Sequence, residues 1–450
     1  MNYFKVALLN FKKNNSLRHR ASRAGSWTIL GHFVSQVLRL GGNLALTRLL
    51  FPEAFGLMAI IQSVIFGISL LSDLGVESSI IRSKRGDDMT FCNTAWTMQI
   101  IKGVFSWLML CLIARPLASF YSEPMLFNLM LVAGFGAVLG GLVSTKFSLT
   151  VRALDLKKRV LIESVTYAIG LFVTILWAWI DHSIWSLVWG GLIGSFAKVV
   201  ASYFMIQGEN NKFAWDRDSV KELFGFGKWV LVSSGLTFLA GEGNKLIIGA
   251  FLGVKLLAFY TLASTMSLMF WMIVQKISNK VLFPAYSEVV RKRPHRLKQV
   301  AAKSRLYLIV PGWLIALFFV LWGDHFMWFL YDERYAESGN MLRLLGLGSL
   351  IGVISGSYNG LLWAKGMVKT STVVLTVQIT VQILGMIIGH HFLGIKGVVL
   401  SVAAVSWILY PLHAYVHARI GLWHPRIDIP LIMLSTIVVA LNFMEIFNHG

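Results

Sequence analysis

Charge is scarce in this sequence. Only 14% of its 450 residues are Asp, Glu, Lys or Arg, while 56% are apolar; in soluble domains about a quarter of the residues are charged. This composition excludes a soluble globular protein. Basic residues outnumber acidic ones by 41 to 21, but they lie between long apolar runs, so we predict no binding to nucleic acid.

Cysteine is nearly absent, and the common catalytic motifs are missing. Cys92 and Cys111 fall in one apolar run, where a helix places them roughly 28 Å apart at about 1.5 Å per residue, too far for a disulfide. The sequence contains no Walker loop, no GxSxG elbow and no HExxH pair. We therefore expect free thiols, no ATP hydrolysis by this chain alone and no enzymatic activity.

Apolar runs of membrane-crossing length dominate the sequence instead. A helix of about 20 residues crosses the hydrocarbon core of a bilayer, and we predict thirteen such spans. They cover residues 26–50, 54–81, 92–114, 125–149, 160–180, 184–206, 224–250, 254–278, 303–323, 339–363, 370–392, 394–417 and 427–447. The sequence thus predicts an all-α, polytopic integral membrane protein.

The Lys and Arg residues indicate the orientation of the chain. They gather before the first span and in every second connection, and the remaining connections hold only Arg48, Arg115, Lys255, Arg334 and Lys396. Because basic connections stay in the cytoplasm, we predict a cytoplasmic N-terminus. Residues 1–24 are expected to form a cytoplasmic segment that can lie on the bilayer as an amphipathic helix.

A long hydrophilic connection near the middle of the chain suggests two lobes. Aligning each position with the one 202 residues later pairs Trp27 with Trp229 and Gly41 with Gly243. Since six spans separate the repeats, the two six-helix bundles are expected to be related by a pseudo-two-fold axis along the membrane normal. The predicted parts are an N-lobe over 25–206, a cytoplasmic inter-lobe loop over 207–223, a C-lobe over 224–418 and an extra C-terminal span within 419–450.

Five cations inside the predicted spans are candidate substrate-binding residues: Arg39, Lys102, Lys198, Lys245 and Arg343. A charge at the centre of a bilayer costs about 3 kcal/mol, so each needs an explanation. Arg39 has no carboxylate three or four positions away. Its expected partner is a side chain on another helix, a backbone carbonyl, water in a cavity or an anionic substrate. Lys102 suits a substrate cavity and an interhelical salt bridge equally.

The acids inside the spans are fewer than the cations. Glu242 and Asp73 are candidate ion-coupling residues, although Glu242 can equally pair with Lys245 on its own helix, and Asp73 can cap a helix end. Glu77 and Glu163 lie near the cytoplasmic ends of spans, and we expect their carboxylates to reach water by snorkelling. The net positive balance suits an anionic substrate, and Arg in particular suits phosphate.

A pair of histidines four positions apart is the remaining ionisable feature. His413 and His417 have no third ligand nearby in the sequence, so we expect a hydrated interfacial pair rather than a metal site. No cofactor is expected.

Several segments, taken in order, resemble one family. They are Arg48-Leu-Leu-Phe-Pro-Glu-Ala-Phe-Gly-Leu-Met, Ser72-Asp-Leu-Gly, Asn93-Thr-Ala-Trp, Ala114-Arg-Pro-Leu-Ala-Ser-Phe-Tyr-Ser-Glu-Pro, Phe226-Gly-Lys-Trp, Asn244-Lys-Leu-Ile-Ile-Gly-Ala-Phe-Leu-Gly and Leu282-Phe-Pro-Ala-Tyr-Ser. Over roughly residues 22–425 the chain is similar to bacterial polysaccharide transporters. These are lipid-linked oligosaccharide repeat-unit flippases of the multidrug/oligosaccharidyl-lipid/polysaccharide (MOP) superfamily.

The resemblance implies a fold, an activity and partners. It implies two six-helix bundles, usually with a further helix pair, around a central cavity. Undecaprenyl-pyrophosphate-linked sugars would move through it from the cytoplasmic to the periplasmic leaflet, for lipopolysaccharide or exopolysaccharide biosynthesis. Coupling to H⁺ or Na⁺ is expected, as are partners among membrane lipids, a polysaccharide polymerase and chain-length or export proteins.

Two departures from the family and three rival functions stay open. Asn244-Lys245 stands where relatives often have Asp-Lys, and thirteen spans stand where they often have fourteen. The rivals are a drug or metabolite antiporter of the same superfamily, a flippase for the peptidoglycan lipid precursor, and a membrane glycan polymerase or ligase. The last usually needs a large periplasmic loop, and the longest outer connection here, about residues 324–338, is short.

Overall fold

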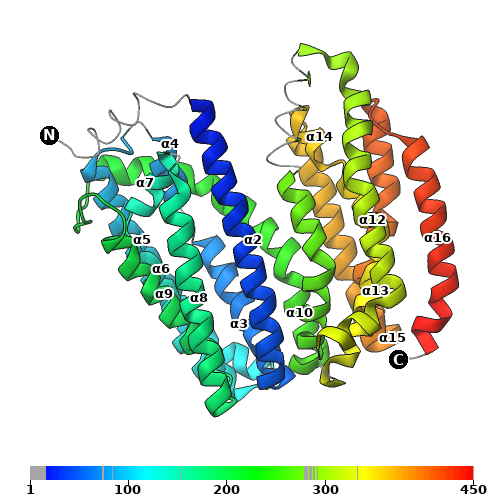
Figure 1. Ribbon diagram of the computed structural model, residues 1–450, viewed down its shortest axis with the longest axis horizontal. Coiled ribbons are helices and arrows are strands. Elements are labelled where there is room, and N and C mark those ends of the chain that lie inside the picture. Colours follow the sequence, from blue (N-terminus) through cyan, green and yellow to red (C-terminus); the bar gives the residue numbers. More distant parts are fainter. Residues whose placement is uncertain are drawn as a thin grey trace. The chain divides into compact units, whose positions relative to one another are not determined.

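The computed structural model describes residues 17–448, apart from residues 73, 74, 84, 154, 278–281, 283–285, 287, 288, 291 and 332. Over these residues every regular element is a helix (Figure 1). The long helices are α2 (Leu17–Leu49), α3 (Pro52–Leu71), α5 (Met89–Phe120), α6 (Pro124–Leu142), α8 (Leu156–Asp181), α9 (Trp185–Phe204), α10 (Arg217–Ile277), α12 (Leu297–Leu330), α13 (Ala336–Gly356), α15 (Val368–Arg419) and α16 (Pro425–Asn448). Shorter elements join them: α4 (Val76–Arg82), α7 (Lys146–Arg152), α14 (Asn359–Ala364), η2 (Pro294–Arg296) and η3 (Glu333–Tyr335).

The predicted all-α architecture is confirmed, and every predicted span coincides with helices of the described chain. Ten stretches of the described residues are long and apolar enough to cross a membrane. The prediction of thirteen differs because α10 and α15 each hold two predicted spans, and because α2 carries too many polar residues for this criterion. Both cysteines are free thiols, as predicted.

Glycine divides the two longest helices into pairs of spans. Gly253 in α10 (φ 81°, ψ 171°) and Gly394 in α15 (φ 55°, ψ −130°) have non-helical backbones. Positive φ is accessible to glycine because it has no Cβ. At Gly394 the helix turns back on itself. The two halves lie side by side, as the hydrogen bond from Ser401 Oγ to the carbonyl oxygen of Gly385 at 2.6 Å shows. The predicted division of α15 at this position therefore has a structural basis.

The chain forms two compact units, the N-terminal unit (Met1–Gly243) and the C-terminal unit (Asn244–Gly450). The boundary falls inside α10, so the predicted inter-lobe loop over 207–223 belongs to the N-terminal unit. There the backbone N–H of Lys212 donates to Asn93 Oδ1 of α5 at 3.1 Å. The predicted lobe limits and the pseudo-two-fold relation between the lobes stay predictions.

Small residues let neighbouring helices of the N-terminal unit approach closely. A Cβ on Gly103 of α5 would overlap the backbone at Ala137 of α6, and Gly170 of α8 meets the backbone of Gly190 of α9 in the same way. Backbones that approach this closely are typical of helix pairs in membranes. These two pairs hold the helices whose inner faces carry the site described below.

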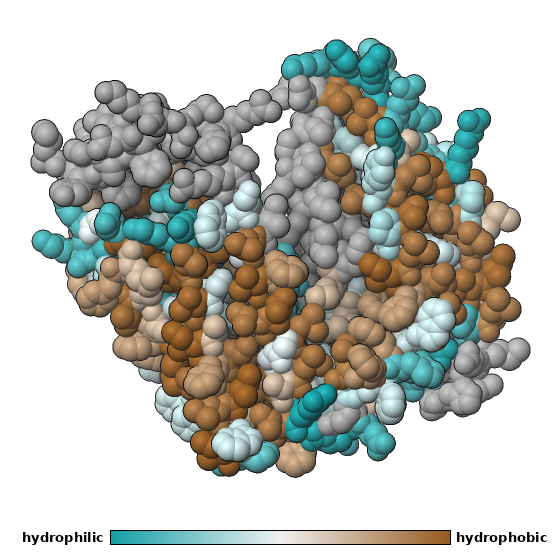
Figure 2. Space-filling view, in the orientation of Figure 1, coloured by the Kyte–Doolittle hydropathy of each residue, from teal (hydrophilic) through white to brown (hydrophobic). Residues whose placement is uncertain are grey.

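Large apolar side chains cover the outer faces of the helices. Phe172 and Trp179 on α8 each expose 66% of their surface, and their spacing of seven places them on one helix face. Figure 2 shows hydrophobic residues along the sides of each unit and hydrophilic residues gathered toward helix ends. Such a surface is unfavourable in water and favourable in lipid. The protein is a multi-pass membrane protein.

Candidate functional site

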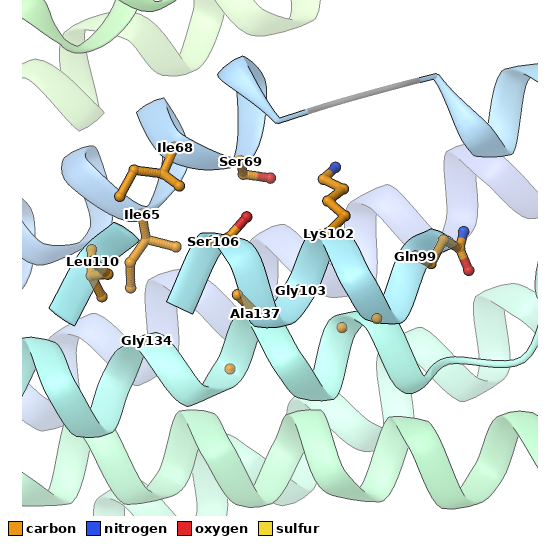
Figure 3. Close-up of a pocket in the computed structure, with 13 residues that line it drawn as sticks. Ile65, Ile68, Ser69, Gln99, Lys102, Gly103, Ser106, Leu110, Gly134 and Ala137 are labelled. Carbon is orange, nitrogen blue, oxygen red and sulfur yellow. The ribbon is translucent and has the colours of Figure 1, made fainter. Parts of the chain in front are cut away.

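A cavity of about 390 Å³ opens between α3, α5 and α6 of the N-terminal unit. Its polar side chains are Gln99, Lys102 and Ser106 of α5 and Ser69 of α3, and Figure 3 shows Lys102, Ser106 and Ser69 extending into the same space. Spacings of three and four place the α5 residues on one helix face. The wall contributed by α6 consists of Gly134, Gly136, Ala137, Gly140 and Gly141. Because these residues are so small, they leave room for the side chains of α5.

A second cavity of about 270 Å³ adjoins the first, since Gln99 and Gly140 line both. Its charged lining residues are Glu77 of α4, Arg159 of α8 and Lys198 of α9. Hydroxyl groups come from Ser144, Ser148 and Ser195. The two cavities together bring the predicted candidates Lys102 and Lys198 to one region and add Arg159, which the sequence did not single out.

Two cations of the second cavity share one aromatic ring. The Cζ atom of Arg159 lies 4.8 Å, and the Nζ atom of Lys198 lies 5.0 Å, from the centre of the Phe147 ring. Phe147 is buried. The negative face of an aromatic ring attracts cations, most strongly where water is excluded. The ring therefore keeps two like charges close together at the cavity wall, which suits a ligand with more than one negative charge.

Two glutamates neutralise Arg159. Its Nη1 atom lies 2.6 Å from Glu77 Oε1, and its Nε atom lies 3.1 Å from Glu163 Oε1. Snorkelling alone therefore does not account for Glu77 and Glu163, because each has a specific cationic partner. The i, i+4 spacing of Arg159 and Glu163 was visible in the sequence. Nothing in the sequence indicated that Glu77 lies beside Arg159, because they belong to different helices.

A buried lysine holds α7, which carries Phe147, against the end of α9. Lys146 Nζ donates to the carbonyl oxygens of Tyr203, Ile206 and Gly208 and to Asn210 Oδ1, at 3.0, 3.2, 3.3 and 2.8 Å. Burial lowers the pKa of Lys146 from its ordinary value, and the four acceptors stabilise its charged form. The position of Phe147, and of the two cations on its ring, depends on this contact.

Arg39 lies on a polar face of α2, in a different place from the two cavities. It is exposed and forms no ion pair with any residue that the structure describes. Helical spacing puts four more polar residues on the same face: Thr28, His32, Ser35 and Asn43. Phe33 and Val37, 66% and 54% exposed, lie on the opposite face. The helix therefore presents one polar and one apolar surface, and Arg39 is central to the polar one.

Of the two candidate ion-coupling residues, Glu242 lies within the described residues. Glu242 on α10 accepts a hydrogen bond from Ser63 Oγ of α3 at 2.6 Å, inside the N-terminal unit. Asp73 lies outside the described residues. Lys245 follows Glu242 by one turn on α10 and is half-buried in the C-terminal unit. An ion-coupling role for Glu242 stays a prediction, as does substrate binding by Lys245.

Arg343 lies between two helices of the C-terminal unit. It is 4% exposed, its Nε atom donates to the carbonyl oxygen of Val320 at 3.0 Å, and its Nη1 atom lies 3.5 Å from Asp324 Oδ2. The guanidinium group thus joins α13 to α12. Substrate binding by Arg343 stays a prediction.

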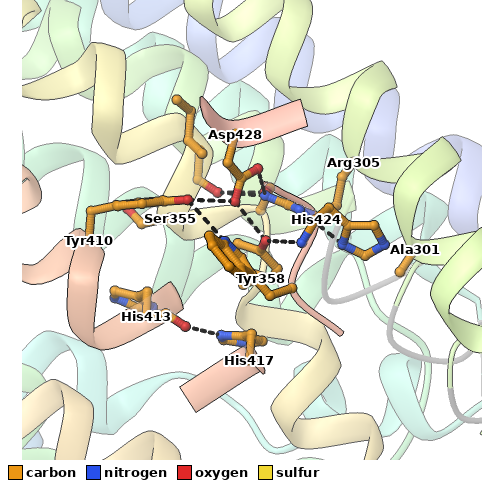
Figure 4. A network of polar contacts seen from close by, with 12 residues as sticks. Ala301, Arg305, Ser355, Tyr358, Tyr410, His413, His417, His424 and Asp428 are labelled. Atoms are coloured by element: carbon orange, nitrogen blue, oxygen red, sulfur yellow. Dashed lines mark hydrogen bonds and ion pairs between the residues drawn. The ribbon is translucent and has the colours of Figure 1, made fainter. Parts of the chain in front are cut away.

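A buried ion pair in the C-terminal unit escaped the sequence analysis (Figure 4). Arg305 of α12 and Asp428 of α16 are both 0% exposed, with Nη2 and Oδ1 2.8 Å apart. The hydroxyls of Tyr358 and Tyr410 donate to Asp428 Oδ2 at 2.7 and 2.9 Å, and Arg305 Nε donates to Ser357 Oγ at 2.8 Å. Arg305 lies at the start of the predicted span over 303–323, where a charge is ordinary, so nothing in the sequence indicated that it is buried. The network joins α16 to the rest of its unit.

His424 completes the network as a neutral imidazole. Arg305 Nη1 lies 3.2 Å from His424 Nδ1, and His424 Nε2 lies 2.8 Å from the carbonyl oxygen of Lys298. Because arginine can only donate, Nδ1 is the acceptor and Nε2 carries the proton. Burial lowers the pKa of His424 from its ordinary value, in agreement with a neutral ring.

Stability is therefore expected to fall on acidification. The folded-state pKa of His424 lies below its unfolded value of about 6.5, so the unfolded chain takes up the proton first. The network is at full strength above that value and loses stability as the pH falls below it. We expect the melting temperature of the detergent-solubilised protein to drop between about pH 7.5 and 5, and to drop less in His424→Asn. Equal slopes for the two proteins would contradict this role of His424.

The predicted hydrated histidine pair is wrong. His417 is 1% exposed, its ring centre lies 4.1 Å from that of Tyr358, and its Nδ1 lies 2.7 Å from the carbonyl oxygen of His413. His417 thus packs into the interior rather than at a wet surface, and His413 is half-buried beside it. Among the described residues, no group of three or more His, Cys, Asp or Glu side chains is placed to hold a metal ion.

Comparison with known families adds to this geometry. The model of the polysaccharide biosynthesis protein family matches residues 45–340, which is more than half of the chain. The chain belongs to this family. Membership in the polysaccharide biosynthesis protein family confirms the resemblance noted in the sequence.

Two relatives illustrate the family. The chain is 22% identical to the succinoglycan biosynthesis transport protein ExoT of Rhizobium meliloti (strain 1021) over 330 residues, which are 72% of this chain and 65% of ExoT. It is 21% identical to the lipopolysaccharide biosynthesis protein WzxC of Escherichia coli (strain K12) over 394 residues, which are 87% of this chain and 80% of WzxC. The match thus spans less than two thirds of the length of ExoT.

Two solved structures show the fold. An inward-facing multidrug resistance MATE family transporter of the MOP superfamily matches with a TM-score of 0.65 and 12% identity, over 89% of this chain and 95% of that one. The lipid II flippase MurJ, in an inward closed conformation, matches with a TM-score of 0.65 and 13% identity, over 93% of each chain. The fold is therefore that of the MOP superfamily, and it does not by itself distinguish the substrates of these proteins.

Proposed function

We propose that this protein is a flippase that moves undecaprenyl-pyrophosphate-linked oligosaccharide repeat units from the cytoplasmic to the periplasmic leaflet of the bacterial inner membrane. The product would serve lipopolysaccharide or exopolysaccharide biosynthesis. The observation that carries the proposal is the pair of adjoining cavities in the N-terminal unit, with Lys102, Arg159 and Lys198 on their walls. Family membership points to a saccharide cargo, and the cations supply what its pyrophosphate needs.

The physical task explains why polar walls are needed inside an apolar protein. Each hydroxyl of a glycan costs several kcal/mol when it enters hydrocarbon without a partner, and a pyrophosphate costs more. Gln99, Ser69 and Ser106 can exchange hydrogen bonds with sugar hydroxyls, and Lys102 and Lys198 can offset phosphate charge. The prenyl chain would remain in the lipid while the headgroup moves by alternating access.

Orientation and energy coupling complete the proposal. The distribution of Lys and Arg supports a cytoplasmic N-terminus. Glu242, hydrogen-bonded to Ser63, and Asp73 are the acids proposed to bind H⁺ or Na⁺ during the cycle. The polar face of α2 around Arg39 would provide a further surface for the glycan.

The charge of the cavities separates this function from its rivals. A multidrug resistance transporter of the MATE family has the same fold. The cavity walls carry Lys102, Arg159 and Lys198 against one lining carboxylate, Glu77, and this positive balance disfavours a cationic cargo. A flippase for the peptidoglycan precursor would meet the same pyrophosphate chemistry. Depletion distinguishes it, because loss of peptidoglycan precursor causes lysis, whereas loss of a surface glycan does not.

The proposed function is tested by mass analysis of lipids from cells that lack this protein. We expect one undecaprenyl-pyrophosphate-linked oligosaccharide to accumulate on the cytoplasmic side, with its sugars matching the missing surface glycan. Expression of the protein from a plasmid should remove the accumulated lipid. Unchanged lipid-linked oligosaccharide together with unchanged surface glycan would refute the proposal.

A further inference from the structure

One carboxylate faces the second cavity together with two cations. Glu77, Arg159 and Lys198 all line it, and Glu77 Oε1 lies 2.6 Å from Arg159 Nη1. Glu163, the second partner of Arg159, is not among its lining residues. Glu77 is therefore the acid that stands where an anionic ligand would meet the arginine.

The local structure holds the helix of Glu77 at its far end. Arg152 of α7 donates from Nη1 to the carbonyl oxygens of Ile80, Ile81 and Ser83, at 3.0, 2.9 and 2.7 Å. These are the C-terminal carbonyls of α4, where a cation is favourable. Glu77 lies in the first turn of α4, at the opposite end, and 48% of its side chain is exposed. Its carboxylate can thus leave Arg159 for water without releasing α4.

We propose that the second cavity is a binding subsite for a diphosphate, and that Glu77 competes with the diphosphate for Arg159. The inference rests on the proposed function and adds a regulatory contact to its site. A half-exposed carboxylate–arginine pair is weak because water and salt screen it. A diphosphate carries more charge and offers oxygens for two parallel bonds to the guanidinium, so it displaces Glu77.

The remaining groups of the cavity fit such a ligand. Lys198, held on the Phe147 ring, supplies a second positive charge, and Ser148 and Ser195 supply hydroxyls. The cavity volume of about 270 Å³ is several times the ~30 Å³ share of one water molecule in the liquid. When the subsite is empty, Glu77 neutralises Arg159. When Glu77 pairs with Arg159 again, the affinity of the subsite for the diphosphate falls. This favours release of the ligand toward the first cavity.

Binding of inorganic pyrophosphate to the purified full-length protein in nanodiscs, measured by calorimetry, tests the inference. Glu77→Gln removes the competitor but keeps the shape, and we expect about threefold to fivefold tighter binding. Glu163→Gln is the matched control, since it makes the same change at the other partner of Arg159 but outside the cavity. We expect a change of less than about twofold there. Lys198→Ala should weaken binding in the wild type and in Glu77→Gln.

A second arm identifies the source of the diphosphate. Nanodiscs that contain undecaprenyl pyrophosphate should bind less added pyrophosphate than nanodiscs without it if the lipid headgroup occupies the subsite, and equal amounts if only free diphosphate does. Either result supports the subsite. Equal affinity of Glu77→Gln and wild type, or no binding by either, would overturn it. Glycan export by the wild-type protein is measured separately, in cells that lack the chromosomal copy. No export by wild type, together with tighter pyrophosphate binding by Glu77→Gln, refutes the function alone. Export by wild type without that gain in binding refutes the inference alone.

Discussion

A Lys102→Ala/Lys198→Ala double variant is expected to lose glycan export by about 100-fold or more. Each lysine lines one of the two adjoining cavities, and a hydrogen bond to a charged group contributes about 1.5–3 kcal/mol, or roughly tenfold or more per residue. The measurement is surface glycan in cells that lack the chromosomal copy, divided by the amount of protein in the membrane.

Two further variants show whether glycan export depends on cations inside the cavities or on any cation of these helices. Lys158→Ala removes a cation beside Arg159 on α8, outside both cavities, and should leave export within about twofold of wild type. Arg39→Ala tests the polar face of α2 separately, and we expect an intermediate loss. Export at the native rate by a double variant that reaches the membrane would refute the assignment of the cavities.

Asp428→Asn is expected to lower the melting temperature of the purified protein by about 6–20 °C. The change leaves Arg305 charged, fully buried and without its counter-ion, and breaking such a pair costs about 3–5 kcal/mol. For a unit of this size each kcal/mol corresponds to roughly 2–4 °C. Because Asp428 also accepts from Tyr358 and Tyr410, α16 should detach first, which limited proteolysis of the C-terminal helix would detect.

Asp324→Asn is the matched control for the buried pair. Asp324 Oδ2 lies 3.5 Å from Arg343 Nη1, and the Asp324 side chain is 34% exposed. Water can therefore replace the carboxylate as a partner of Arg343. We expect a loss below about 1 kcal/mol. Similar melting temperatures for Asp428→Asn and Asp324→Asn would show that the Arg305 network does not hold α16.

The fold was predictable because it depends on local features of the sequence. Each apolar run is long enough to require a helix in lipid, and each break, such as Gly394 in α15, is marked by residues that end or turn a helix. Lys102 and Lys198 were found for the same reason: a cation inside an apolar run stands out without knowledge of its neighbours.

The contacts between helices were not predictable in this way. Arg305 and Asp428 are far apart in the sequence, and each lies near the predicted end of a span, where a charge is ordinary. Glu77 and Arg159 likewise meet only once α4 packs near α8. Arg343 stands out in the sequence as a cation inside a span, but the sequence does not indicate its contact with Asp324. Pairing across helices is decided by packing, which a single sequence does not specify.

The most direct test of the central claim is leaflet-resolved flipping in proteoliposomes. The purified protein is reconstituted with its lipid-linked oligosaccharide, and a membrane-impermeant glycosidase added outside reports how much glycan has reached the outer leaflet. We predict that wild-type protein exposes glycan initially held inside and that Lys102→Ala/Lys198→Ala does so at the rate of protein-free liposomes. Equal rates for wild type, the double variant and protein-free liposomes would contradict flipping through the cationic cavities of the N-terminal unit.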